Sequence, residues 1–195
     1  ILSTRPWHQK LVLEYGVEHP GDMDHYLEIV TPKVGVVTTI SPTHLRYFKN
    51  LEGVFREKSK LISTLFKFGH AVLNADDPQV VKMMHLTPAR IWWFGQKSKE
   101  GVKVSHYSQN FKGSKFRLHY QGQKATVNWR IIGRHQLTSA YAAATVGIIC
   151  GLTLKQIAKG LSATKSPEHR LNLIVTKKIK ILDDTYNASP KAAIE

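Results

Sequence analysis

The stretch VGVVTTI at Val34–Ile40 decides the fold, together with LEGVFREKSKLISTLFK at Leu51–Lys67 and AVLN from Ala71. The first stretch is a short, nearly uninterrupted apolar run, which is typical of a strand buried on both faces of a parallel sheet. The second repeats apolar residues at helical spacing. The third is again a short apolar run at Ala71–Leu73. Because strand and helix alternate, the sequence predicts βαβ units and an α/β fold.

The alternation continues outward from this centre in both directions. Leu11–Leu13 predicts a further buried strand, and Asp22–Val30 predicts a helix that follows it. On the other side, Pro78–His85 predicts a helix and Ile91–Phe94 a strand. We therefore expect a mostly parallel sheet that is flanked by helices.

The pattern changes after Val102. The segments KFRLHY and KATVNWR alternate apolar and polar residues on either side of Gln121-Gly122-Gln123, which predicts an antiparallel hairpin, a small β subregion beside the main sheet. The remaining elements expected are helices at Gln136–Cys150, capped by Gly151, and Leu154–Ser162, and strands at Leu171–Thr176 and Ile179–Leu182.

The composition bounds the function classes. Of 195 residues 42% are hydrophobic, so a sizeable core can form, and no apolar run approaches the roughly 20 residues of a membrane span. The single Cys150 excludes an internal disulfide, so we expect a cytoplasmic protein in which this residue packs in the core.

The net charge of +14 favours anionic partners, and Lys97–Arg134 holds nine Lys or Arg against one acid, Glu100. The alternative for that region is a solvated surface.

Two candidate ligand-binding side chains follow predicted strands. Glu14 comes directly after Leu11–Leu13, and His44 comes four residues after Val34–Ile40. The carboxyl ends of parallel strands meet at one edge of a sheet, where α/β proteins bind ligands. A carboxylate there suits Mg²⁺, whereas a histidine is less expected because Mg²⁺ prefers oxygen. Each residue taken alone also fits a structural role.

Lys58 lies in an unusual place on its predicted helix. At 100° per residue it falls in the middle of an apolar stripe that runs from Leu51 to Leu65, while Lys60 falls on the opposite face. A lysine on a buried face needs a reason. Either its ammonium reaches past the edge of the stripe to water, or it has lost its charge or found an anionic partner in a site.

Two blocks near the C-terminus carry further polar groups. Arg170 lies in SPEHRLN (166–172), just before a predicted strand, where an arginine can bind phosphate or form a surface ion pair. ILDDTYNASP (181–190) places carboxylates and an amide at a strand end, as Asx-rich turns also do. The chain contains no GxxxxGK[ST] phosphate loop, no GxGxxG and no zinc-ligand spacing.

Five blocks in order resemble the central domain of the Mur ligase family. They are VLEYGVEHPGDMDHYLEIVTPKVGVVTTISPTHLRYFKNLEGVFREKSKLI (12–62), NADDP (74–78), GRHQLTSAYAAA (133–144), SPEHRLN and ILDDTYNASP, and the resemblance covers almost the whole chain. The HPG element and the DDTYNASP ending most resemble the members that add D-alanyl-D-alanine. The helix reads HQLTSA where the family has two asparagines, and Glu18 stands where related enzymes often carry Asn.

The resemblance implies a role for each matching residue. Glu14 and His44 would bind Mg²⁺, and Lys58 would be carbamylated, its carbamate helping to hold a second Mg²⁺. His19 would belong to a substrate-facing loop. The positions implied on the nucleotide or hinge side are Asn74, His135, Arg170, Asp184 and Asn187.

The resemblance also implies a reaction and a domain plan. The family uses ATP and Mg²⁺ to turn a substrate carboxylate into an acyl phosphate, which an amine then attacks; here the substrates would be a UDP-N-acetylmuramoyl tripeptide and D-alanyl-D-alanine. Residues 1–182 would be the central domain without its phosphate-loop segment, and 183–195 would begin the C-terminal domain. We expect an excerpt of a longer cytoplasmic, monomeric enzyme, inactive by itself, with no nucleic-acid partner and no membrane insertion.

Two alternatives remain open at this stage. One is another ligase of the same superfamily, such as an amino-acid-adding Mur ligase or a folylpolyglutamate or cyanophycin synthetase, which shares the ATP site and differs in substrate. The other is a basic domain that binds nucleic acid, which the positive charge of Lys97–Arg134 favours. No recognisable DNA- or RNA-binding module supports it.

Overall fold

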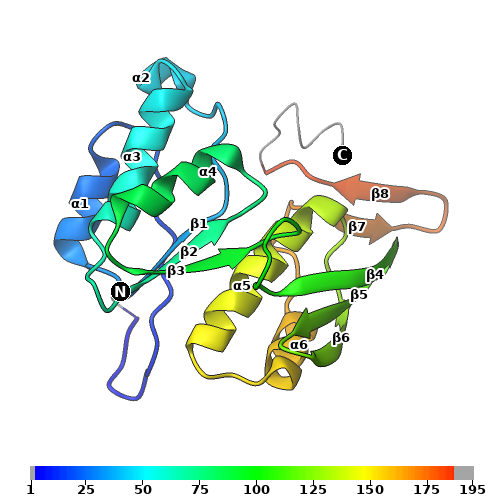
Figure 1. Cartoon of the computed structure of the whole chain (residues 1–195). Coiled ribbons are helices and arrows are strands. Elements are labelled where there is room, and N and C mark those ends of the chain that lie inside the picture. Colours follow the sequence, from blue (N-terminus) through cyan, green and yellow to red (C-terminus); the bar gives the residue numbers. More distant parts are fainter. Residues whose placement is uncertain (1–2, 187–195) are drawn as a thin grey trace.

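A three-stranded parallel sheet forms the centre of the computed structural model, which describes residues 3–186 (Figure 1). Its strands are β1 (Val34–Val37), β2 (His70–Asn74) and β3 (Arg90–Phe94), in the order β1-β2-β3. The register pairs Val34 with His70 and His70 with Arg90. The predicted α/β class and the parallel sheet are therefore confirmed.

One face of the sheet is covered by α3 (Leu51–Ser63), α4 (Pro78–Lys82) and the short 3₁₀ helix η1 (Met83–Leu86). The side chain of Asn50 caps α3 by accepting from the amide of Gly53 (3.0 Å). α1 (Asp22–Ile29) packs against α3. The short α2 (Leu45–Phe48) comes directly before α3 in the chain. This face is sealed by apolar side chains that include Val54, Ile62, Leu65, Leu73, Val80 and Met83.

The opposite face of the sheet carries α5 (Leu137–Ile149), which contacts β2 and β3, and α6 (Leu154–Ala163) packs beside it. A second, antiparallel sheet consists of β4 (Lys103–Asn110), β5 (Gly113–Tyr120) and β6 (Gln123–Trp129). Its inner residues share a core with α5 and α6 (Figure 1). The 3₁₀ helix η2 (Arg134–Gln136) leads into α5.

The C-terminal part of the described chain is an antiparallel hairpin of β7 (Asn172–Val175) and β8 (Lys180–Asp183). Each of the two predicted strands is present, and each of their bounds differs from the prediction by one residue. No helix in residues 3–186 is long and apolar enough to cross a membrane.

Several elements differ from the prediction in extent. The strand expected over Val34–Ile40 ends at Val37, and the helix expected over Leu51–Lys67 ends at Ser63. The helix expected over Pro78–His85 divides into α4 and η1. The expected hairpin is a three-stranded sheet, because β4 adds to its edge across a bulge between Ser105 and Ser108.

The strand predicted at Leu11–Leu13 is wrong: this segment is extended but pairs with no strand of the described chain. Val12 is 90% exposed, so the apolar run is not buried. Side chains hold the segment instead. The hydroxyl of Tyr15 donates to the carbonyl of Val30 (3.0 Å), and its ring stacks on Tyr26 at 5.1 Å. Apolar composition alone could not show that no strand edge would reach this segment.

Candidate functional site

Three polar side chains tie together the carboxyl ends of β1, β2 and β3. Asn74, at the end of β2, is buried; its amide donates to the carbonyl of Thr38 (2.8 Å), and its oxygen accepts from the backbone of Asp76 (2.9 Å). The carboxylate of Asp76 accepts from the amides of Gln96 and Lys97 after β3, at 2.8 Å each. The NADDP segment thus fixes the edge of the sheet where ligands bind in α/β proteins.

Asp77 connects this edge to two further elements. One carboxylate oxygen caps α4 by accepting from the amides of Gln79 and Val80 (2.8 and 3.1 Å). The other accepts from the hydroxyl of Thr39 (2.8 Å) and the amide of Ile40 (2.9 Å), just after β1. Burial works to raise the pKa of Asp77, but these four hydrogen bonds outweigh it and hold the pKa below its usual value.

Lys58 of α3 reaches the same edge. Its side chain is half-buried, and its ammonium lies 3.5 Å from the carbonyl oxygen of Thr39. Burial lowers the pKa of this ammonium, and the negative charge of Asp77 offsets part of the effect. The helical period thus predicted the side of α3 that carries Lys58, where the ammonium lies against the carbonyl of Thr39.

The neighbouring residue Glu57 holds a second part of the site. Its side chain is only 4% exposed, and one oxygen accepts from the amides of Gly21 and Met23 (2.9 Å each) at the start of α1. The other accepts from the ammonium of Lys60 (2.7 Å). A carboxylate from α3 therefore supplies the N-terminal cap that α1 lacks locally.

Lys60 was expected on the face of α3 opposite the apolar stripe, and α1 packs along this face. The ammonium lies between Asp24 (2.6 Å) of α1 and Glu57, and its side chain is 32% exposed. Burial works to lower the pKa of Lys60, but the hydrogen bonds to both carboxylates outweigh it and raise the pKa. The helix therefore has two packed faces, one toward the sheet and one toward α1.

His19 lies in a loop that is fixed from within. The carboxylate of Asp22 accepts from the amides of Glu18 and His19 (2.9 and 2.7 Å), and the imidazole of His19 packs on Tyr47 at 4.1 Å between ring centroids. Tyr47 belongs to α2, which begins directly after His44. The structure therefore brings the segments of two predicted residues, His19 and His44, next to each other.

His44 itself is exposed and has a left-handed backbone (φ 52°), a conformation that costs energy for a residue with a side chain. Glu14 is exposed as well. In residues 3–186, no three His, Cys, Asp or Glu side chains gather in a way that could hold a metal ion. The assignment of Glu14 and His44 as metal ligands stays a prediction.

Arg170 is held in a strained loop between two left-handed residues, His169 (φ 62°) and Leu171 (φ 50°). Its guanidinium lies 4.2 Å from the ring centroid of Tyr186. The carboxylate of Asp184 accepts from the amide of Leu171 (3.2 Å), so Arg170 and Asp184 belong to one loop cluster. Asn187, which the sequence placed in the same group, lies outside the described residues.

His135 lies in η2, half-buried, with its ring against Gly133. A Cβ on Gly133 would come within 2.6 Å of that ring, and the backbone there has φ 104°, so both sterics and conformation require glycine. The GRH part of the predicted block is therefore a local packing unit at the start of α5. Gln136 and Ser139 follow on η2 and α5.

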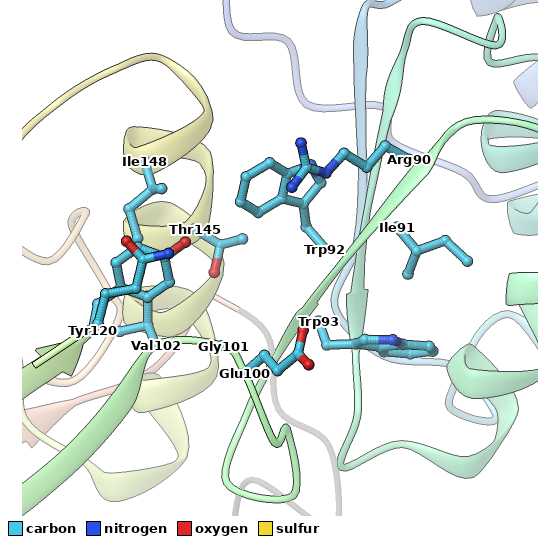
Figure 2. Close-up of a pocket in the computed structure, with 11 residues that line it drawn as sticks. Arg90, Ile91, Trp92, Trp93, Glu100, Gly101, Val102, Tyr120, Thr145 and Ile148 are labelled. Carbon is cyan, nitrogen blue, oxygen red and sulfur yellow. The ribbon is translucent and has the colours of Figure 1, made fainter.

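The structure also contains a cavity of about 170 Å³ between β3 and α5 (Figure 2). Figure 2 shows the guanidinium of Arg90 beside the indole of Trp92, 4.5 Å from its centroid, with Glu100 at another wall. None of the predicted site residues lines this cavity. It opens on the side of the sheet away from α3 and Lys58 and is separate from the strand-end site.

Sequence reasoning missed the two carboxylates that organise the site. A signal existed for Asp77, because Asp directly before Pro78 is a helix N-cap pattern. No signal existed for Glu57, whose partners lie 34 and 36 residues away in the chain.

A family model described as the Mur ligase middle domain matches residues 2–147. UDP-N-acetylmuramoyl-tripeptide--D-alanyl-D-alanine ligase of Mycobacterium tuberculosis is 34% identical over 92% of this chain and 36% of its own length. The ligase of the same name from Buchnera aphidicola is 31% identical over 100% of this chain and 43% of its own. The chain thus spans about two fifths of the relatives it matches.

Solved structures of ligases from this family have the same fold as this chain. MurF from Acinetobacter baumannii superimposes with a TM-score of 0.91 at 28% identity, over 99% of this chain and 42% of that protein. MurF ligase from Thermotoga maritima, solved in complex with ADP, gives a TM-score of 0.77 at 25% identity, over 90% of this chain and 40% of that one.

Proposed function

The chain belongs to the Mur ligase family, and from that premise we propose that it is the central part of an ATP-dependent ligase that joins D-alanyl-D-alanine to a UDP-N-acetylmuramoyl tripeptide. The observation that carries the proposal is that 92–100% of this chain matches relatives bearing that name in several bacteria. The protein would act in peptidoglycan synthesis in the cytoplasm, as a monomer.

The strand-end site supports the proposal. Asn74, Asp76 and Asp77 hold the ends of three parallel strands in fixed positions, and Lys58 lies beside them. The His19 loop and the start of α2 meet next to α3. A site of this kind positions substrates by rigid elements, which contributes much of the rate when a phosphoryl group is transferred.

Lys58 is the residue on which we would place carbamylation. Carbon dioxide adds to a neutral amine, so the burial that lowers the pKa of Lys58 also raises the fraction of the reactive form. As the nitrogen bonds to the carbon of carbon dioxide it loses a proton, which leaves an anion with two oxygens. Burial disfavours this anion as it does the ammonium, so the carbamate needs a cation or a hydrogen-bond donor beside it. The adjacent Glu57 accepts hydrogen bonds from Gly21 and Met23, and so holds the segment that follows His19 against α3.

For Mg²⁺ the fit is incomplete. The described Glu14 and His44 are exposed and gather no third ligand, so we derive no catalytic step through the metal. For ATP, Arg170 is presented by a strained loop next to Asp184, and we propose that this loop contacts the nucleotide. Asn187, His135 and Asn74 are further proposed nucleotide contacts. His19 remains the proposed substrate contact.

The domain plan is also a proposal. We place the end of the central domain near residue 182, at β8, with 183–195 opening a further domain. The phosphate loop that the chain does not contain would come from another segment of the full protein, so the isolated chain should hydrolyse no ATP.

The full-length protein provides the test. It is incubated with ATP, magnesium and the UDP-linked tripeptide, and ADP release is compared with D-alanyl-D-alanine, D-alanine or single L-amino acids as the acceptor. We expect turnover only with the dipeptide. Turnover with a single amino acid and none with the dipeptide would assign another member of the superfamily and refute the proposal.

Variants test the site within that assay. Lys58→Ala should abolish ligation, while the matched variant Lys155→Ala, at an exposed position of α6, should leave it unchanged. If Lys58→Ala retains full activity, the carbamate role is wrong even when the substrate assignment is right.

A further inference from the structure

The outer face of the antiparallel sheet β4–β6 is a continuous basic surface. Residues paired across strands point to the same side, and the register aligns Lys103, His119 and Lys124 in one row. The next two rows are centred on Arg117 and Lys115, and their other members are serine, threonine and asparagine. The inner positions of the same strands, such as Phe116, Leu118, Val127 and Trp129, are buried against α5 and α6.

This surface carries no acid. Within residues 3–186, none of its four cations is paired with a carboxylate, and only Lys103 has a hydrogen bond through its ammonium, to the carbonyl of Gln96 (3.3 Å). The nearest acid in sequence, Glu100, lines the cavity between β3 and α5 instead. Burial lowers the pKa of His119, and the charges of Lys124 and Arg117 add to this effect.

The cations of this face do not lie directly opposite one another: Arg117 faces Ser105 and Thr126, and Lys115 faces Ser108 and Asn128. They lie at diagonal positions or two residues apart on β5, where their repulsion is weak and is screened by salt. An anionic partner on this surface would meet all four cations without breaking an ion pair of the described residues.

The shape of the surface selects the partner. Three strands about 4.8 Å apart, with their side chains, form a face broader than the major groove of duplex DNA, which is about 12 Å wide, so the face cannot enter it. No outward position of the three strands carries a tyrosine, phenylalanine or tryptophan, so there is no platform on which single-stranded bases could stack. A plane of anionic headgroups, in contrast, meets all the cations at once.

We propose that the outer face of β4–β6 binds the surface of an anionic lipid bilayer, with Lys115, Arg117 and Lys124 as the central contacts. Binding is electrostatic and peripheral, because no outward position of the three strands carries a large apolar side chain; the exposed Phe111 lies in the turn between β4 and β5. The surface lies on the opposite side of this sheet from α5 and α6 and is distinct from the strand-end site.

Vesicle sedimentation of the 195-residue chain tests the proposal. Phosphatidylcholine vesicles are compared with vesicles that also contain phosphatidylserine. Each Lys or Arg close to such a surface strengthens binding about 5-fold, so Lys115→Gln/Lys124→Gln should reduce partitioning about 30-fold. The control Lys155→Gln/Lys159→Gln removes the same charge from exposed positions of α6 and should change it little. Circular dichroism verifies that both variants are folded.

Three results would overturn the proposal. One is no preference for the anionic vesicles at low salt. Another is an equal loss in both double variants, which would mean that only net charge matters. The third is tighter binding of duplex DNA than of vesicles at the same salt with the same dependence on Lys115 and Lys124, which would assign the face to nucleic acid. None of these results bears on ligase activity, so the two proposals fail separately.

Discussion

Replacing Asp77 should show how much of the fold depends on one carboxylate at the strand ends. Its two oxygens accept different hydrogen bonds: one caps α4, and the other binds Thr39 and Ile40 in the segment after β1. Asp77→Ser keeps a capping oxygen and removes the connection to β1. Asp77→Ala removes both. Comparing the two variants therefore separates the two duties.

The expected magnitudes follow from these bonds. A helix cap is worth about 1 kcal/mol. A backbone amide that donates to a charged group contributes about 1.5–3 kcal/mol, and the buried Ile40 would lose that partner in both variants. We expect the free energy of unfolding to fall by about 2 kcal/mol in Asp77→Ser and about 3 kcal/mol in Asp77→Ala. For comparison, Asp24→Ala, which removes a largely exposed partner of Lys60, should cost less than about 1 kcal/mol.

Urea unfolding measures these differences, and hydrogen exchange locates them. Exchange should accelerate at the amides of Ile40, Gln79 and Val80 in Asp77→Ala, but mainly at Ile40 in Asp77→Ser. If Asp77→Ala costs no more than the Asp24→Ala control, or if the Ile40 amide keeps its protection, then the carboxylate does not hold the strand ends and the reasoning fails.

The same residue gives a pH dependence of known sign. Because the folded pKa of Asp77 lies below the unfolded value, its contribution is fully present above about pH 4 and is lost as the pH falls through the folded pKa. The stability difference between wild type and Asp77→Ser should therefore be constant near neutral pH and should shrink in acid. A difference that persists unchanged at the lowest pH where the chain stays folded would contradict the assigned hydrogen bonds.

Three further changes probe other parts of the structure. Glu57→Gln should destabilise the chain by about 2 kcal/mol and speed hydrogen exchange at the amides of Gly21 and Met23, because a neutral amide caps α1 more weakly; unchanged exchange there would exclude the cap. Lys58→Met should raise the free energy of unfolding by about 1 kcal/mol at neutral pH while abolishing ligation in the full protein, since burial disfavours the ammonium; a loss of stability would show that the charge is well accommodated. Gly113→Ala should destabilise the β4–β5 turn by more than about 1 kcal/mol, because its Cβ would lie 2.0 Å from the carbonyl oxygen of Trp129 at φ 141°; a neutral result in urea unfolding would mean that the turn rearranges.

The sequence by itself determined the class of the fold, the order of its elements and the family. Short apolar runs and a helical repeat are local patterns, and β1, α3, β2 and β3 occur where those patterns lie. The position of Lys58 on the packed side of α3 was also readable, because the helical period alone places it there.

Only the tertiary structure decided which polar groups meet. Leu11–Leu13 carries the apolar signature of a strand, yet whether a strand forms depends on a neighbouring edge, which no local pattern encodes. The local sequence shows no sign of the partners of Glu57 and Lys60; the packing of α1 against α3 makes Glu57 a cap of α1 and pairs it with Lys60. Of the nine Lys and Arg between Lys97 and Arg134, four form a surface only because the strand register puts them on one side of a sheet. Contacts of this kind join residues far apart in the chain, so they follow from packing and not from periodicity.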